Sequence, residues 1–186
     1  MVHWFLKTKH FIPDAHEKTI YDIDYKALKT ANITVLFFDI DNTLIPYDLA
    51  LPTEPLINHF DTLAKYGFKI VFVSNNHYRR IKKFSEALGY PFVHSAKKPS
   101  KFGLKRALKM LDVKVEKSEI MFVGDQLMTD VYGAKRFGIN VTLVEPIKRK
   151  TEKWYTKINR YIETKMLKKI QKKYPDKYDN LKLDTR

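Results

Sequence analysis

Five short apolar segments, separated from one another by helical patterns, constrain the fold of this chain more than any other feature. The segments between them repeat apolar residues at helical spacing, and two of these end at Gly89 and Gly138. Strands that alternate with helices form a parallel sheet covered on both faces. We therefore expect an α/β fold of three layers with a mainly parallel central sheet. The five predicted strands are residues 33–39, 68–76, 91–96, 119–126 and 139–146.

Composition indicates one globular domain with anionic partners. The 186 residues, 44% of them hydrophobic, suit a single domain, with a core at about 30–146 and a basic helical segment at about 147–186. The net charge of +14 favours phosphate esters, nucleic acid or an anionic membrane as partner. The absence of cysteine excludes disulfides and thiolate metal sites.

The sequence indicates neither a membrane span nor a signal peptide. No apolar run approaches 18 residues, the length that a spanning helix requires. The segment "MVHWFLKTKHFIP" has neither a long apolar stretch nor a small-residue cleavage site. We therefore expect a cytoplasmic protein.

Polar side chains follow the ends of four predicted strands. In an open parallel sheet, ligands bind at the carboxyl ends of the strands. The joint arrangement therefore predicts one site at that edge. Its candidate residues are Asp39, Asp41, Ser74, Asn75, Lys98, Asp125 and Asp130.

Asp39 and Asp41 follow a strand that reads as fully buried. Alternate residues of an extended chain point to the same side, so both carboxylates could face one site. Two carboxylates so close together repel each other. A bound divalent cation, or a reaction on a phosphate group, would account for their placement. The simpler interpretations are a turn for this pair, and helix caps for Ser74 and Asp130. Arg79 and Arg80 either grip a substrate or are merely solvated.

Four motifs in order resemble those of the haloacid dehalogenase (HAD) superfamily of phosphatases. They are "DIDNT", "VSNN", "KKP" and "GDQLMTD", each at a predicted strand end. The N-terminal "FIPDA…IYDID" and the "W…T…NR…E" pattern after the last strand resemble the YqeG-like group. That group belongs to capless subfamily III and is related to phosphatidylglycerophosphate phosphatases.

The resemblance implies that Asp39 is a nucleophile that forms an aspartyl-phosphate. Asp41 would be the general acid and base. A Mg²⁺ ion would be held by Asp39, the backbone carbonyl of Asp41 and Asp125. Because a carboxylate and a phosphate dianion repel each other, the cation would make their approach feasible.

The resemblance also implies a set of phosphate-binding residues. Ser74 and Asn75 would bind the phosphoryl group, and Thr43 would hold the turn after the nucleophile. Lys98 would stabilise charge on the same oxygens. We prefer Lys98 over the adjacent Lys97 because the family's lysine usually precedes a proline. Asp130 would orient Lys98 or metal-bound water.

The motif spacing leaves no room for a large cap domain. Asp41 and Ser74 are 33 residues apart, and Ser74 and Lys98 are 24 apart, so each interval fits one strand–helix unit. We therefore expect an open site that admits bulky or surface-borne substrates.

The segment 146–186 carries 14 Lys and Arg against 5 Asp and Glu. Its apolar residues recur at helical spacing, which predicts a basic amphipathic helix. This helix either packs on the domain with a solvated lysine face or docks on an anionic membrane. The apolar residues are Trp154, Ile158, Tyr161, Ile162, Met166, Leu167 and Ile170.

The function predicted from these features is Mg²⁺-dependent hydrolysis of a phosphomonoester, with phosphatidylglycerophosphate as the first choice of substrate. One alternative is a nucleotide or nucleic-acid phosphatase, but no aromatic pattern for base recognition supports nucleic acid as a partner. Another is a non-catalytic phosphate-binding switch. The tandem Asp39–Asp41 and the late Asp125 fit a hydrolase better. The sequence does not indicate an oligomeric state.

Overall fold

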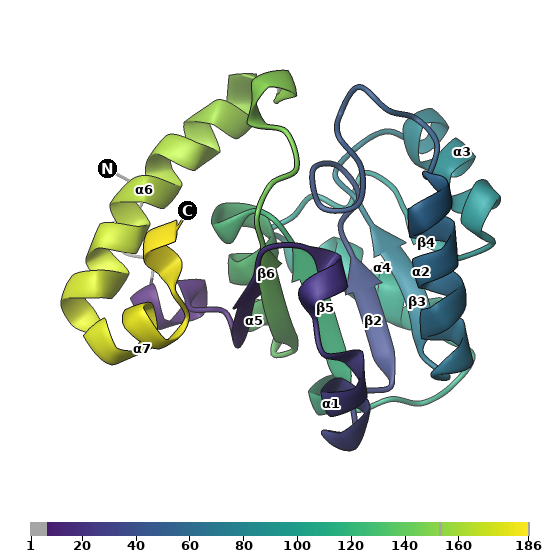
Figure 1. Cartoon of the computed structure of the whole chain (residues 1–186), viewed down its shortest axis with the longest axis horizontal. Helices are drawn as coiled ribbons and strands as arrows, with labels where there is room; N and C mark the ends of the chain where they lie inside the picture. Colours follow the sequence, from purple (N-terminus) through teal and green to yellow (C-terminus); the bar gives the residue numbers. More distant parts are fainter. Residues whose placement is uncertain (1–6, 153, 186) are drawn as a thin grey trace.

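The computed structural model describes residues 7–152 and 154–185 and contains a six-stranded parallel sheet (Figure 1). The strand order is β1-β6-β5-β2-β3-β4. This sheet, with helices on both faces, confirms the predicted α/β fold. The strands are β1 (Ala15–Glu17), β2 (Val35–Phe38), β3 (Lys69–Val73), β4 (Phe92–Val93), β5 (Ile120–Gly124) and β6 (Asn140–Val144).

Helices form the outer two layers. One face of the sheet packs against α1 (Tyr25–Thr30), α2 (Glu54–Lys65) and α3 (Tyr78–Leu88). The opposite face packs against α4 (Lys101–Lys109) and α5 (Tyr132–Phe137), and α6 (Trp154–Lys173) lies at the side of the domain, against the single turns η2 (Thr8–Phe11) and η5 (Leu127–Val131). A short α7 (Pro175–Asn180) follows α6. Further single turns are η3 (Ile20–Asp22), η4 (Lys117–Glu119), η6 (Arg149–Thr151) and η7 (Leu183–Thr185).

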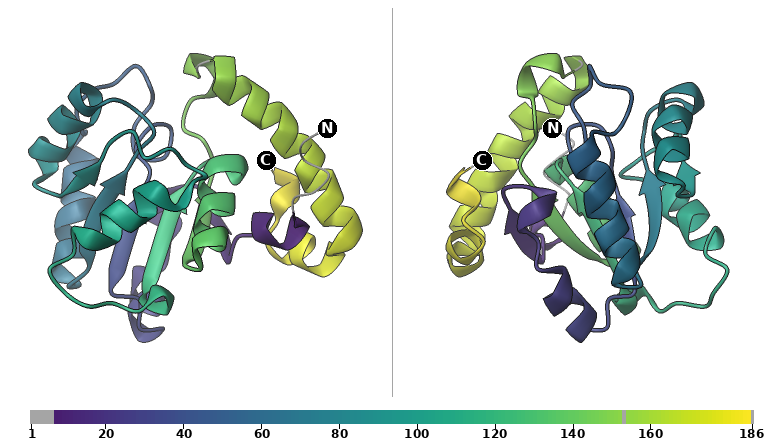
Figure 2. Two further views of the ribbon diagram at one scale, coloured as in Figure 1. Left: turned by 180° about the vertical axis from the view of Figure 1, so that it is seen from behind. Right: turned by 45° about the vertical axis from the view of Figure 1, so that its right-hand side comes forward.

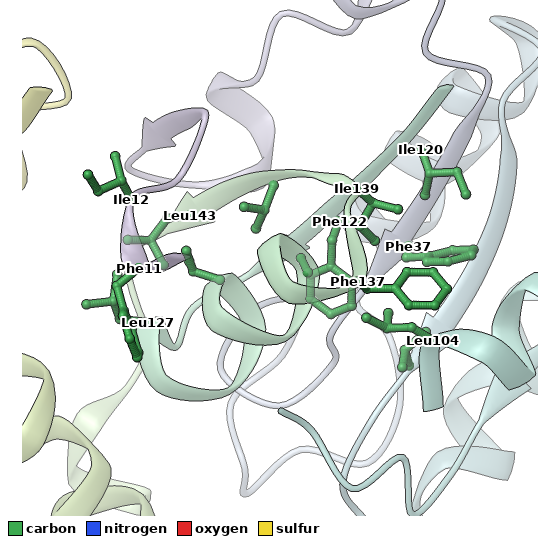
Figure 3. Packing of buried hydrophobic residues seen from close by; sticks show 14 of the residues in the cluster. Phe11, Ile12, Phe37, Leu104, Ile120, Phe122, Leu127, Phe137, Ile139 and Leu143 are labelled. Atoms are coloured by element: carbon green, nitrogen blue, oxygen red, sulfur yellow. The ribbon is translucent and has the colours of Figure 1, made fainter. Parts of the chain in front are cut away.

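The apolar run of β2 supplies both halves of the core. Because successive strand residues point to opposite faces, Phe37 joins the cluster on the α4–α5 side and Phe38 joins the cluster on the α2–α3 side. Figure 3 shows the first cluster, in which Phe37 and Phe122 of neighbouring strands lie near Leu104 of α4. Burial on both faces explains why this strand reads as a continuous apolar run.

Three local features differ from the sequence-based prediction. The edge strand β1 was not predicted, because Ala15–Glu17 is short, half-buried and without apolar alternation. Within the predicted strand at 91–96, only Phe92–Val93 pairs with β3. The predicted helical segment that ends at Gly138 begins with a π-helical turn, η5, before α5.

The basic C-terminal segment has two different halves. The second half of α6 packs on the domain, where Met166, Leu167 and Ile170 join the core together with Phe11. The first half leaves Trp154 and Tyr161 exposed, at 73% and 63%. Figure 2 shows α6 leaning against the side of the domain beside α7 and the N-terminal segment. The second half therefore packs on the domain, as the first interpretation expects, and docking of the helix on a membrane stays a prediction.

The intervals between the motifs hold no cap. Between Asp41 and Ser74 the structure contains a loop, α2 and β3, and between Ser74 and Lys98 it contains α3 and β4. Among the described residues, no helix combines the length and the hydropathy that crossing a membrane requires. Residues 1–6, on which the interpretation of the N-terminal segment partly depends, lie outside the described residues.

Candidate active site

The carboxyl ends of the strands bring a lysine and several aspartates together. The ammonium Nζ of Lys98 lies 2.6 Å from Oδ1 of Asp39 and 2.8 Å from Oδ1 of Asp130. All three residues are buried, as is Asp125, which follows β5. Asp39 follows β2 and Asp130 lies in η5. Two neighbouring strands and two loops thus form one buried ionic cluster.

Three carboxylates of this cluster could hold a cation. Asp39, Asp125 and Asp130, here called the acidic trio, each offer an oxygen within 4.8 Å of the others. Burial raises the pKa of Asp39 well above its usual range; Lys98 opposes this shift, and Asp130 adds to it. Carboxylate oxygens are the protein ligands that Mg²⁺ prefers. The residues present therefore fit a hard divalent cation.

Lys98 is held in its charged form. Burial alone would lower its pKa, but the carboxylates of Asp130 and Asp39 more than compensate, so that the pKa lies above its ordinary value. Lys97, by contrast, is exposed, and its ammonium lies 6.0 Å from the ring centroid of Phe102. The structure thus places Lys98, and not Lys97, among the acidic groups.

Asn75 holds the backbone of Lys98. Its Oδ1 accepts a hydrogen bond from the backbone N–H of Lys98 at 2.7 Å, and its Nδ2 donates to the carbonyl oxygen of the same residue at 3.2 Å. The side-chain oxygen and nitrogen of Asn75 are thus both hydrogen-bonded to the backbone of Lys98. Asn75 also lines the cavity of the site, and its expected contact with phosphate stays a prediction.

Gly124 makes room for Asp130. An ideal Cβ at Gly124 would lie 2.6 Å from the carboxyl carbon of Asp130, too close for any real contact. The backbone N–H of Gln126 then donates to Oδ2 of Asp130 at 3.0 Å. The glycine before Asp125 and the turn η5 thus let one short segment supply two carboxylates.

Asp41 occupies a different environment. Its Oδ1 accepts hydrogen bonds from Arg80, from Nη2 at 2.9 Å and Nε at 3.2 Å. Its Oδ2 accepts from Nδ2 of Asn76 at 3.1 Å and contacts the Ser74 hydroxyl at 3.5 Å. Arg80 also bonds to the carbonyl oxygens of Pro46 and Leu49 in the loop after β2. The Asp41 carboxylate is not part of the acidic trio, and binding of a metal by the Asp41 backbone carbonyl stays a prediction.

Asp125 is held by two groups. The hydroxyl of Thr43 donates to its Oδ1 at 3.2 Å, so Thr43 contacts a carboxylate within the site. On the other side, the guanidinium of Arg160 contacts Oδ2 and donates to the backbone carbonyl oxygen. Arg160 comes from α6, which the sequence-based site did not include.

Part of this site lines one cavity of about 340 Å³. Asp39, Asp41, Ser74 and Lys98 line it, and Asn159 of α6 contributes a wall. The nucleophile and the acid predicted from "DIDNT" therefore face the same space, with different partners. The room suits a phosphate group and the first atoms of its leaving group.

Sequence reasoning did not predict the contacts of three polar residues with Asp41 and Asp125. Arg80 was considered only as a solvated or substrate-gripping residue, and Asn76 was treated as part of the loop "SNN". Arg160 stands in the "NR" pair of the C-terminal pattern, which was the available signal. None of the three contacts could be deduced, because each joins segments more than 30 residues apart.

Comparison with known proteins identifies the family. The family described as "Mitochondrial PGP phosphatase" matches residues 1–148. The chain belongs to this family. "Probable phosphatase YqeG" of Bacillus subtilis is 38% identical over 165 residues, which cover 89% of this chain and 94% of that protein. The predicted membership of the YqeG-like group of HAD phosphatases is thus confirmed.

Two further relatives define the extent of the likeness. "Phosphatidylglycerophosphate phosphatase 1, chloroplastic/mitochondrial" of Arabidopsis thaliana is 29% identical over 187 residues, covering 90% of this chain and 51% of that one. The chain therefore spans about half the length of this plant protein. A solved structure from Cytophaga hutchinsonii, a "possible sugar phosphatase, HAD superfamily", has a TM-score of 0.50 at 15% identity, over 75% of this chain and 93% of that one. This likeness concerns the fold alone. The PGP phosphatase family member described here is a phosphatase of HAD type.

Proposed function

We propose that this protein is a Mg²⁺-dependent phosphomonoester hydrolase that acts through an aspartyl-phosphate on Asp39, with phosphatidylglycerophosphate as its substrate. The observation that carries the proposal is the position of Asp39, which lines the cavity with Lys98 at 2.6 Å and belongs to the acidic trio. A nucleophilic carboxylate needs positive charge nearby to accept a phosphate dianion. Lys98 supplies one such charge from the protein itself.

The proposed reaction has two displacement steps. In the first, an oxygen of Asp39 attacks phosphorus, and the bond from phosphorus to the leaving oxygen breaks while Asp41 donates a proton to that oxygen. In the second, Asp41 removes a proton from water, which attacks phosphorus and releases Asp39. Inorganic phosphate and an alcohol are the products, and each residue returns to its starting state.

The residues around the cavity divide the supporting roles. Lys98 and the hydroxyl of Ser74 stabilise the phosphoryl oxygens. Asp39, Asp125 and the backbone carbonyl of Asp41 would hold Mg²⁺, which when bound neutralises negative charge on the phosphate. Asp130 orients Lys98 through the 2.8 Å ion pair. Asn75 and Thr43 act on Lys98 and Asp125 through hydrogen bonds.

The named function of the relatives and the open site support the lipid substrate. Phosphatidylglycerophosphate carries a terminal phosphomonoester on a headgroup that is anchored in a bilayer. Without a cap, a headgroup that projects from a membrane can reach Asp39. We accordingly propose a peripheral location on the cytoplasmic face of a membrane.

Exposed apolar side chains at the edge of the site favour this location. Leu49 and Leu51 lie in the loop after β2, and Trp154 lies at the start of α6; these three residues are here called the apolar rim. Both segments stand at the same edge of the sheet in Figure 1. Nζ of Lys148, in the segment that leads to α6, lies 2.5 Å from Oδ2 of Asp48 in the loop after β2. Apolar side chains surrounded by lysines are typical of surfaces that bind anionic lipid interfaces.

The test is phosphate release from phosphatidylglycerophosphate in vesicles, compared with sugar phosphates, nucleotides and 3′-phosphorylated oligonucleotides. We expect the lipid to give the highest kcat/KM, and Asp39→Asn to abolish hydrolysis while it retains the fold. Asp112→Asn, an exposed aspartate in the loop before β5, is the matched control and should keep full activity. Faster turnover of a nucleotide or oligonucleotide would overturn the lipid substrate. Substantial activity of folded Asp39→Asn would overturn the covalent mechanism.

A further inference from the structure

Arg160 contacts Asp125 from a helix that begins outside the region matched by the family. The match ends at residue 148, whereas α6 begins at Trp154. The guanidinium donates from Nη1 to the backbone carbonyl oxygen of Asp125 at 2.8 Å and pairs with its Oδ2 through Nη2. The side chain of Arg160 is only 12% exposed. A buried arginine thus grips both the backbone and the side chain of one proposed metal ligand.

Two further carboxylates hold Arg160 in place. Oε1 of Glu152 accepts from Nη2 at 2.8 Å and from Nε at 3.1 Å, and Oε2 of Glu163 lies 3.4 Å from Nη1. Both glutamates are buried and pair with Arg160 at opposite ends of its guanidinium. Burial would lower the pKa of Arg160, but Asp125 and Glu163 raise it above its usual range. The guanidinium is therefore charged, and each of its three nitrogen atoms has a hydrogen-bond acceptor.

The glutamates connect this arginine to the core motifs. Oε1 of Glu152 accepts a hydrogen bond from Nδ2 of Asn42, the residue after Asp41. Oε2 of Glu163 accepts one from the backbone N–H of Leu127 in η5. The loop after β2 and the turn after β5 are thus tied to α6. A helix with only a packing role would not need the buried carboxylates of Glu152 and Glu163 to bond the loop after β2 and the turn η5.

We propose that Arg160 is a positioning residue of the active site. It fixes Asp125 in the orientation that cation binding requires, which makes α6 part of the catalytic unit. The inference rests on the proposed function and deepens it. Arginine suits this role because its planar fork engages two acceptors in a fixed geometry, which the point charge of lysine cannot do. Thr43 holds Oδ1 of Asp125 and Arg160 holds Oδ2, so rotation of the carboxylate is restrained from both sides.

The experiment measures Mg²⁺ binding to purified protein by isothermal titration calorimetry in the absence of substrate, with thermal unfolding recorded with and without Mg²⁺. We expect Arg160→Gln to weaken Mg²⁺ binding by roughly 10–100-fold, the usual effect of losing a residue that orients a metal ligand. It should also lose the rise in unfolding temperature that Mg²⁺ gives to the wild type. Arg160→Lys keeps the positive charge and serves if the glutamine variant does not fold; it should also bind Mg²⁺ more weakly.

Two controls separate positioning from simple anchoring of the helix. Arg149→Gln removes an exposed arginine from the same segment and should bind Mg²⁺ like the wild type. Met166→Ala weakens the packing of α6 at its far half and should lower the unfolding temperature without changing Mg²⁺ affinity. Wild-type Mg²⁺ affinity in either folded Arg160 variant would overturn the inference and leave the proposed function standing. Absence of Mg²⁺ binding in the wild type would overturn both.

Discussion

At the scale of single residues, Asp39 and Asp41 show how two nearby carboxylates can take different roles. Asp39 contacts the ammonium of Lys98, whereas Asp41 is held by Arg80 and Asn76. A nucleophile must face the phosphorus atom, and an acid must face the leaving oxygen. Both carboxylates line one cavity with separate partners, an arrangement that suits the two roles proposed for them.

Substitution of Asp41 tests its proton-transfer role. Asp41→Asn should slow the hydrolysis of an alkyl phosphate by roughly 10²–10⁴, the usual loss for a general acid–base. The loss should be smaller for p-nitrophenyl phosphate, because its leaving group departs without protonation. Steady-state kcat/KM for both substrates, with burst kinetics to identify the slow step, provides the measurement. Equal losses while the first step limits both reactions would contradict the acid role.

Local motifs and long-range contacts differ in how far they can be predicted. Asp39, Lys98 and Asp125 could be placed at one edge because the rule for parallel sheets depends only on strand order. The contacts of Arg80 with Asp41 and of Arg160 with Asp125 depend on how helices sit against that edge. No spacing in the sequence encodes those distances, so these contacts emerged only from the structure.

At the scale of elements, the junction of β5 and η5 concentrates the chemistry in a short segment. Gly124 ends the strand, Asp125 follows it, and Asp130 lies in a π-helical turn. π-helical turns occur frequently at functional sites. Here the turn brings the carboxylate of Asp130 back over the glycine, beside Lys98.

This arrangement predicts a specific defect for Gly124→Ala. The added methyl group would overlap the Asp130 carboxyl group, so we expect a loss of about 1–3 kcal/mol in the free energy of unfolding and a fall in kcat. Urea denaturation and phosphatase assays measure the two effects. In a double-mutant cycle, Gly124→Ala should cost little in an Asp130→Gly background, which lacks both the Cβ and the carboxyl group that the methyl group would overlap. Additive costs would show that the methyl group acts elsewhere.

The elements themselves could largely be predicted, with instructive exceptions. The strands β2, β3, β5 and β6 lie within the predicted segments, because strands buried on both faces read as continuous apolar runs. β1 lacks that signal, since an edge strand of three half-buried residues needs few apolar side chains. β4 keeps only two paired residues, and the loop that follows carries Lys98 into the site.

At the scale of the whole molecule, exposed basic residues lie close in sequence to Trp154 of the apolar rim, an arrangement suited to an anionic membrane surface. Each Lys or Arg close to an anionic surface contributes about 1 kcal/mol of attraction. Lys148, Arg149 and Lys150 are exposed beside the rim. The loop after β2 and the start of α6 lie at the same end of the molecule in Figure 1.

Vesicle sedimentation tests this arrangement. Wild-type protein should bind anionic liposomes at low salt, bind less at high salt, and bind neutral liposomes weakly. Leu51→Glu and Trp154→Glu should each reduce binding several-fold, because a charge replaces an exposed apolar side chain at the interface. Val113→Glu, an exposed apolar position in the loop before β5, is the matched control and should bind normally. Equal binding by all three variants would exclude the rim as the contact surface.

The contact between Asp125 and Arg160 also has a consequence for folding during translation. Arg160 follows Asp125 by 35 residues, and the motif residues Asp39, Ser74 and Lys98 are all synthesised earlier still. Chains fold from the N-terminus during translation, so the sheet and its motif residues can assemble on the ribosome before α6 emerges. Because Asp125 then lacks its arginine, we expect the nascent chain to bind Mg²⁺ more weakly until α6 docks.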